Sequence, residues 1–404
     1  MISATPTEIV IDTMDEAKEV YRNKEMRQAL YDAGEIVMAD VLVNLHADDH
    51  RSRRRLENRL FRRETLVHYE RDLFPSVIER TLAPYVVAGH AEMVELSHQL
   101  MMNLAALNAG VDRATGTADE TARLYAQMMK FIEGATLAHT TRDPRQVEAE
   151  IAVSLDEFDR EFLTPSIQRR QQLLAAVAGG QADPASLPLD VLTVLLRNED
   201  SLHLPHEVIL REISFFLLAG AHTSATAFVR TLDHLFHWTA AHPDDIQRVR
   251  TDRGFVQRAV YETIRLAPSS PTGMRWALAD VTLKSGRAIQ QGTRVVIDLA
   301  TINRDPAIFG DDASSFDPNR TPTVEGVAPW GLSFGQGMHA CIGQELAAGL
   351  LERSAETAEH EYGLVAVAVQ AMIDRGVRLD PGDVPTMDTA TKRPYWSRYP
   401  VLLG

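Results

Sequence analysis

The chain has 404 residues, of which 45% are hydrophobic and 24% charged, and this composition is that of a soluble globular protein rather than a disordered or fibrous one. The net charge of -15 argues against a protein that binds nucleic acid through its overall field. The single cysteine, Cys341, excludes a disulfide within the chain and leaves no Cys pair for a structural zinc or an iron–sulfur cluster.

The N-terminal residues 1–8 lack a basic stretch followed by an apolar one, which argues against an ordinary secretory signal. The longest apolar run, Ile213 to Val229, contains Ser, His and Thr, so it is too polar for a membrane span and predicts a buried core helix. We therefore expect a cytoplasmic protein with no membrane partner.

A basic segment stands out in this acidic chain. Residues 50–64 contain seven arginines against two glutamates. The usual interpretation of such a run is a solvated helix face. In an acidic protein the same segment also suits the docking of an acidic electron carrier.

Glycines and prolines mark the next elements. The stretch Ala176 to Ser186 predicts a loop between two helical regions. Pro205 opens a long apolar-periodic segment that ends before Pro243, as expected for a helix with proline in its first turn and proline after its end. This is the longest helix that the sequence predicts.

Short strands are predicted beyond a further helix. That helix, Phe255 to Leu266, stops ahead of Pro268. Strand-like runs follow at Val281 to Leu283 and at Thr293 to Leu299. The last forty residues are typical of more short strands and turns, so the expected fold class is mainly helical with small sheets.

Cys341 lies in the run Phe334-Gly-Gln-Gly-Met-His-Ala-Cys-Ile-Gly343, which predicts a loop that feeds a helix. A lone cysteine can be a buried structural residue, a nucleophile or a single axial ligand, and burial is the commonest case. A thiolate that ligates a haem iron needs backbone able to approach the porphyrin closely, which Gly337 and Gly343 allow because they lack a Cβ. Phe334 is placed to shield the sulfur from water.

This run resembles the haem-binding loop of the cytochrome P450 family, whose pattern is Phe-x-x-Gly-x-x-x-Cys-x-Gly. Average residue usage gives odds of roughly one in a thousand for the four residues at this spacing in such a chain. The resemblance implies that Cys341 is the axial ligand of haem b (iron protoporphyrin IX), with Phe334 and Gly343 in its loop.

The segment Ala219-Gly-Ala-His-Thr-Ser224 is similar to the oxygen-binding segment of that family. In that family a threonine hydroxyl donates a hydrogen bond to the carbonyl four residues earlier, which loosens the helix. The resemblance implies that Thr223 is the donor, that Ala219 provides the carbonyl, and that Gly220 helps to loosen the helix. His222 departs from the family, which usually carries Asp or Glu. It is either a proton relay or a core histidine paired with a backbone carbonyl.

A charge network is implied by the family's Glu-x-x-Arg pair, found here as Glu262 and Arg265. Such pairs are common, and this chain has others, among them Glu157 and Arg160. The Glu262 copy alone is followed by the downstream residues that the family requires, and its third member is Arg320. The resemblance implies a buried structural network that fixes the loop leading to Cys341.

The two haem propionates need cations. The family's propionate positions correspond here to Arg275, His339, His50 and Arg54. A surface role is the alternative for Arg54 taken alone.

The resemblance runs from about Glu8 to the C-terminus and implies one haem domain over residues 1–404, with the family's first helix and strand absent. It implies a monooxygenase that inserts one atom of O2 into a hydrophobic organic substrate. No flavin or ferredoxin domain fits in this length, so electrons would come from separate proteins, a ferredoxin and its reductase. A peroxide-driven peroxygenase and a non-catalytic haem sensor or carrier are the alternatives.

Overall fold

The computed structural model describes residues 7–351 and 360–404, which form mainly helices with a few small sheets, as the sequence predicts. The described chain divides into two compact units. Unit 1 contains the chain up to Leu30, Thr226–Leu379 and Leu402–Gly404, and unit 2 contains Tyr31–Ala225 and Asp380–Val401. The single haem domain stays a prediction.

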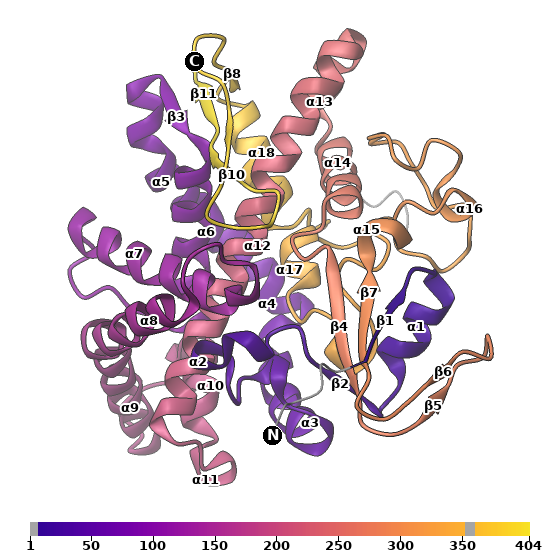
Figure 1. Cartoon of the computed structure of the whole chain (residues 1–404). Helices are drawn as coiled ribbons and strands as arrows, with labels where there is room; N and C mark the ends of the chain where they lie inside the picture. The colour runs from indigo at the N-terminus through magenta and orange to yellow at the C-terminus, as the bar shows by residue number, and fades with distance from the viewer. Residues whose placement is uncertain (1–6, 352–359) are drawn as a thin grey trace. The chain divides into compact units, whose positions relative to one another are not determined.

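Unit 2 is mostly helical (Figure 1). Its helices are α2 (Glu35–Met38), α3 (Ala47–Glu57), α4 (Arg63–His68), α5 (Phe74–Ala88), α6 (Met93–Ala109), α7 (Ala118–Ala135), α8 (Pro144–Phe158), α9 (Thr164–Ala178), α10 (Val191–Arg197) and α11 (Glu199–Leu202). Its short strands are β3 (His90–Glu92), β9 (Thr386–Met387) and β10 (Trp396–Arg398), and β11 (Pro400–Leu402) reaches into unit 1.

Side-chain caps set several helix starts in unit 2. The Glu92 carboxylate accepts hydrogen bonds from the amides of Val94 and Glu95 at the start of α6. Asp143 caps α8 directly before Pro144, whose missing N–H costs nothing at the first helical position. The loop predicted around residues 176–186 is present, since α9 ends at Ala178 and α10 begins at Val191.

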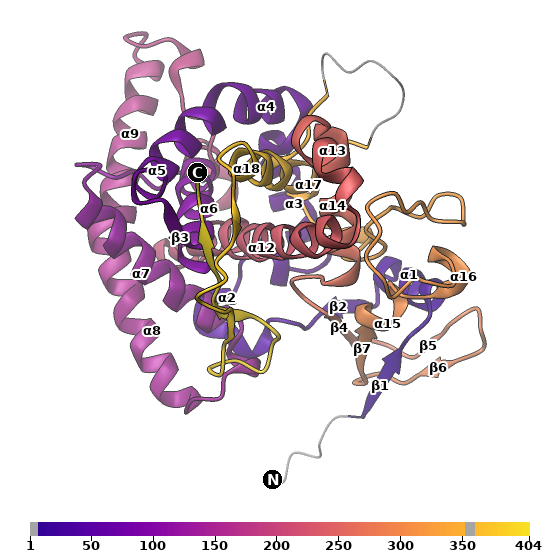
Figure 2. The same cartoon turned by 90° about the horizontal axis from the view of Figure 1, so that it is seen from above.

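Helix α12 (His206–Ala241) is the predicted long helix, and it runs from unit 2 into unit 1 (Figure 2). By length and composition it passes the test for a membrane span, as the only helix of the described residues to do so. However, 83% of its most apolar window is buried in the protein. It is therefore a core helix, as its Ser, His and Thr residues predict.

Unit 1 is built on a four-stranded sheet in the order β1 (Glu8–Ile11), β7 (Arg294–Asp298), β4 (Thr272–Ala277) and β2 (Met26–Gln28). Its other elements are α1 (Met14–Arg22), α13 (Ile246–Thr251), α14 (Arg253–Leu266), β5 (Val281–Thr282), β6 (Ala288–Ile289), α15 (Leu299–Ile302), α16 (Pro306–Phe309), α17 (Gln344–Ala348), α18 (Leu364–Ile373) and β8 (Arg378–Leu379). Strands β1 and β7 are parallel, and the other pairs of the sheet are antiparallel.

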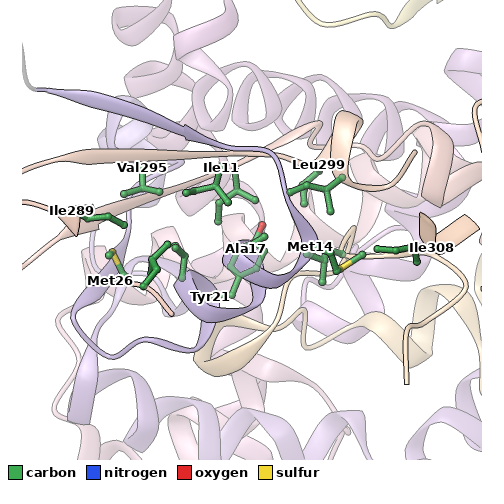
Figure 3. Close-up of a cluster of buried hydrophobic side chains, with 14 of the residues drawn as sticks. Ile11, Met14, Ala17, Tyr21, Met26, Ile289, Val295, Leu299 and Ile308 are labelled. Carbon is green, nitrogen blue, oxygen red and sulfur yellow. The ribbon is translucent and has the colours of Figure 1, made fainter. Parts of the chain in front are cut away.

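An apolar cluster holds α1 against this sheet (Figure 3). Met14, Ala17 and Tyr21 of α1 share the cluster with Ile11 of β1 and Val295 of β7. Along β4, buried and half-buried residues alternate, so that Gly273, Arg275 and Ala277 lie on the buried face. The strand pattern thus places an arginine inside unit 1.

The strands and turns predicted for the last forty residues are confirmed in part. Strands β8, β9, β10 and β11 lie there, but α18 occupies Leu364–Ile373. Its run Leu-Val-Ala-Val-Ala-Val is rich in β-branched residues, which favours a strand locally. Most of α18 is buried, so tertiary packing outweighs that preference.

Candidate haem-binding site

Cys341 lies at the end of a tight loop in unit 1. A 3-10 turn at Gly337–His339 precedes it, and α17 follows at Gln344. The Cys341 amide donates a hydrogen bond of 2.8 Å to the Phe334 carbonyl, which closes the loop. The thiol itself is exposed. The cysteine is therefore not a buried core residue. Its backbone is held by a hydrogen bond, and its sulfur is accessible at the surface of the loop.

The glycine at 337 has a role that the sequence did not show. Its φ is +71°, and a Cβ there would lie 2.4 Å from the Tyr21 carbonyl oxygen at the end of α1. A side chain is therefore excluded by packing within unit 1, whether or not a porphyrin approaches. Gly343 has φ -91°, a value that any residue adopts.

Aromatic rings pack against the start of the cysteine loop. Phe334 is half-buried and packs edge-on against Trp330, with ring centroids 5.5 Å apart. Trp330 is 4% exposed and in turn meets Tyr261 of α14 edge-on at 5.1 Å. Such pairs contribute about 0.5–1.5 kcal/mol each beyond the apolar area that they bury. They fix the start of the loop against α14.

Asn303 fastens the same loop by hydrogen bonds. Its side-chain oxygen accepts from the Leu332 amide at 2.9 Å, and its amide nitrogen donates to the Ser333 hydroxyl at 2.8 Å. The carbonyl of this fully buried residue accepts from Arg265 at 2.6 Å. No sequence motif pointed to Asn303, yet it joins the predicted charge network to the cysteine loop.

The network itself brings together Glu262, Arg265 and Arg320. Arg265 contacts the Glu262 carboxylate through two hydrogen bonds of 2.6 and 2.7 Å. Arg320 donates to the same carboxylate at 2.9 Å. Glu262 is 4% exposed and Arg265 is fully buried. A two-pronged contact of this kind holds a guanidinium rigidly, so α14 is tied to the segments that bear Asn303 and Arg320.

Arg275 of β4 is 3% exposed. Its guanidinium donates to the Gln28 side chain at 2.6 Å and lies over the Tyr21 ring at 4.8 Å.

In unit 2, α12 carries the residues that resemble an oxygen-binding segment. The Thr223 hydroxyl donates to the Ala219 carbonyl at 2.8 Å, which is the predicted contact. Helix α12, all of whose residues are described, is nevertheless helical without a break at this point, so the expected opening is not present. Gly220 permits close packing instead, because a Cβ there would lie 3.2 Å from the Ala105 side chain of α6.

His222 contacts a second histidine that the sequence analysis missed. Its Nδ1 lies 3.2 Å from Nε2 of His98 on α6, and the two rings stack with centroids 5.5 Å apart. Tyr395 approaches His222 edge-on at 5.2 Å. His222 therefore contacts a side chain of a neighbouring helix. A separation of 124 residues left no local signal for this pair.

His50 and Arg54 lie on α3. His50 is 2% exposed, and burial, followed by Arg54 and His46, lowers the pKa of its imidazole to about 4. Arg54 is half-buried and donates to the Asn58 side chain at 3.0 Å.

Glu57, at the end of α3, and Glu212 of α12 form a buried acid pair that the sequence also missed. Both side chains are fully buried, and the charge of Glu212 is one of the causes that raise the pKa of Glu57. Glu212 accepts from Arg53 at 2.7 Å and from the Leu42 amide, whereas burial raises the pKa of Glu57 well above its usual range. Two carboxylates with one arginine leave one excess negative charge, so Glu57 holds a proton.

The residues of unit 1 fit a haem by their chemistry. The only thiol of the chain is exposed at the end of a loop whose backbone is anchored at Leu332 and Phe334. Arg275 is a buried cation of the same unit. His339 lies in the turn two residues before the cysteine. The predicted residues divide between the units, with Cys341, His339, Phe334, Gly343, Arg275 and the charge network in unit 1 and the rest in unit 2.

Known proteins similar to this chain belong to one family. A relative from Mycobacterium tuberculosis, named as a cytochrome P450 126, is 32% identical over 206 residues, 51% of this chain. The match spans about half of that relative, 47% of its length. A Streptomyces melanosporofaciens protein, cyclooctat-9-en-7-ol 5-monooxygenase, is 24% identical over 79% of this chain and 71% of its own.

Solved structures show the same fold. The crystal structure of CalO2 has a TM-score of 0.72 with 21% identity and covers 98% of this chain and 90% of its own. The family model described as Cytochrome P450 matches residues 150–351, which is half of the chain. The chain therefore belongs to the cytochrome P450 family.

Proposed function

We propose that this protein is a haem-thiolate monooxygenase that inserts one atom of O2 into a hydrophobic organic substrate. The observation that carries the proposal is the geometry of Cys341, an exposed thiol on a loop anchored through Phe334, Asn303 and the buried Glu262 network. A ligand loop of this kind must hold the sulfur at a fixed position, and these contacts do so.

Haem b would supply, when bound, the iron that activates O2. The Cys341 thiolate would bind that iron. Arg275, His339, His50 and Arg54 would hold the two propionates, because charge-assisted hydrogen bonds to carboxylates are the strongest that these side chains make. The chain's own contribution would be to hold and orient the group.

Thr223 and His222 would deliver protons. The Thr223 hydroxyl already bonds the Ala219 carbonyl, so it is held in one rotamer. His222 stands where the family usually has an acid, and an imidazole can gain and lose a proton near neutral pH. Gly220 and Thr223 are both exposed.

A hydrophobic substrate follows from the apolar residues of the proposed region. Phe215 and Ala219 of α12 are half-buried, and the segment Pro271–Met274 and the turn near Thr389 are the other parts expected to contact the substrate. Phe216 is buried and stacks on Phe61, so it belongs to the core. A compound panel read by the shift of the Soret band would identify the substrate class.

Electrons would come from a ferredoxin and its reductase. Exposed arginines on the segment 50–64 suit an acidic carrier, namely Arg51, Arg55, Arg59, Arg62 and Arg63. Arg53 is not available for docking, because it is buried against Glu212.

Turnover assays test the proposal. With a surrogate ferredoxin, its reductase and NADPH, a monooxygenase oxidises compounds of the panel that shift the Soret band. Oxidation with hydrogen peroxide alone, and not with the electron-transfer proteins, would instead show a peroxygenase. A haem spectrum with neither activity would show a sensor or carrier.

A further inference from the structure

The pair His98–His222 joins α6 to α12 inside unit 2, where these helices lie side by side (Figure 2). His98 is 6% exposed, and its Nδ1 lies 2.8 Å from the carbonyl oxygen of Val94, one turn earlier on α6. Its Nε2 lies 3.2 Å from His222 Nδ1. The three groups therefore form a chain from a backbone carbonyl through one imidazole to the next.

The Val94 carbonyl fixes the tautomers along this chain. A carbonyl oxygen only accepts, so His98 Nδ1 must carry a proton and donate it. Burial lowers the pKa of His98, and a neutral His98 then has a lone pair on Nε2. Since that lone pair accepts, His222 must donate from Nδ1. Neutral His222 is therefore left with its lone pair on Nε2.

We infer that His98 is a positioning residue that holds His222 in the tautomer needed to carry protons. The inference rests on the proposed function. In each cycle His222 gains a proton at Nε2 and releases it from the same nitrogen, while Nδ1–H stays bonded to His98. A base is held in the same way in the Ser-His-Asp triad, where a third group fixes the tautomer and stabilises the imidazolium.

His98 does not itself pass the proton onward. Transfer through it would require the release of its Nδ1 proton to the Val94 carbonyl, which is not a base. Glu92, at the start of α6, partly offsets the lowering of the His98 pKa by burial, and the Tyr395 ring meets His222 edge-on. The proton must therefore enter and leave at His222 Nε2.

Nitrogen NMR tests the tautomer without any turnover. The holoenzyme is labelled with ¹⁵N-histidine and examined as the diamagnetic ferrous carbon monoxide complex, with resonances assigned from His98→Gln and His222→Gln. The expected result is a protonated Nδ1 and an unprotonated Nε2 on His222. In His98→Phe, which keeps a flat ring but removes the acceptor, both tautomers should be populated. Protonated Nε2 in the native protein, or an unchanged tautomer in His98→Phe, would overturn the inference.

Turnover supplies the second readout. With the surrogate ferredoxin system and no added substrate, His98→Phe should release more hydrogen peroxide per NADPH oxidised, with rates of water formation about tenfold lower. His98→Gln should lie near the native protein, because its amide oxygen can accept from His222 Nδ1. A native yield from His98→Phe contradicts the positioning role.

Different results would contradict the proposed function and the inference about His98. Loss of the thiolate-ligated carbon monoxide spectrum in the native protein would contradict the proposed function while leaving the histidine tautomers measurable. A normal spectrum in both variants, with tautomers and peroxide yields unchanged, would overturn the inference about His98 alone.

Discussion

The proton on Glu57 is the most unusual feature at the residue scale. Glu57 and Glu212 lie fully buried with a single arginine, Arg53, whose guanidinium contacts Glu212. Burial raises the pKa of Glu57 well above its usual range and that of Glu212 to about 7. The proton belongs on Glu57, because Arg53 and the Leu42 amide stabilise a charge on Glu212.

Replacement of Glu57 by Gln should therefore stabilise the protein at high pH. The raised pKa in the folded state means that the unfolded chain releases this proton first, so the native protein loses stability as pH rises above about 4.3. Gln keeps a hydrogen-bond donor and does not titrate. At pH 8 we expect a free energy of unfolding higher by on the order of 1 kcal/mol, with the gain vanishing below pH of about 4.3.

Denaturant unfolding between pH 4 and 8 measures this effect. The control is Glu64→Gln, an exposed glutamate of the same basic segment, whose stability should follow that of the native protein at every pH. A constant difference between Glu57→Gln and the native protein across this range would show that Glu57 is not the group that holds the proton.

At the scale of elements, α14 organises the cysteine loop. Arg265 of this helix bonds Glu262 and the Asn303 carbonyl, and the Asn303 side chain bonds Leu332 and Ser333 just before Phe334. Ser333 also donates back to the Ile264 carbonyl of α14 at 2.8 Å. The position of the sulfur thus depends on a buried charge far from it in sequence.

Replacement of Glu262 by Ala should destabilise the protein by about 3–5 kcal/mol, because Arg265 and Arg320 are left as buried cations without their carboxylate. Haem content after expression should fall with it. Thermal unfolding and the haem-to-protein ratio measure both effects.

The chain offers a matched control. Glu157 and Arg160 have the same Glu-x-x-Arg spacing on the surface of unit 2, and Glu157 is exposed. Glu157→Ala should change stability by less than about 0.5 kcal/mol. Equal effects of the two substitutions would refute the structural role of the Glu262 network.

Sequence patterns predicted the elements that local signals control. Pro205 and Pro243 bracket α12 as expected, and the helix predicted from Phe255 begins two residues earlier, at Arg253. Contacts between distant segments could not be predicted. The buried pair Glu57–Glu212 and the link through Asn303 join residues that no spacing rule connects, and α18 forms against its β-branched composition because it is buried.

At the scale of the whole molecule, the exposed arginines of residues 50–64 contrast with a net charge of -15. Two charged residues of this segment, Arg53 and Glu57, are buried and do not contribute to its surface. Arg55 and Arg59 are exposed and have no role in the proposed haem site. Substitution of these two arginines therefore tests a docking surface for an acidic ferredoxin without altering the proposed haem site.

The double substitution Arg55→Glu and Arg59→Glu should slow reduction by the ferredoxin about tenfold or more at low salt, because steering by opposite charges raises association rates by that order. The difference from the native protein should shrink as salt rises. Stopped-flow reduction measures it. Arg145→Glu, an exposed arginine at the start of α8, is the control and should leave the rate unchanged. An equal loss in Arg145→Glu would mean that only net charge matters.

The central claim is that Cys341 binds a haem iron through its sulfur, and one spectrum tests it most directly. The protein is reduced with dithionite and exposed to carbon monoxide, and the difference spectrum is compared with that of Cys341→Ser. The native protein should show the red-shifted Soret band of a thiolate-ligated haem, and the variant should lack it. A native protein without that band, or a variant that retains it, would contradict the account.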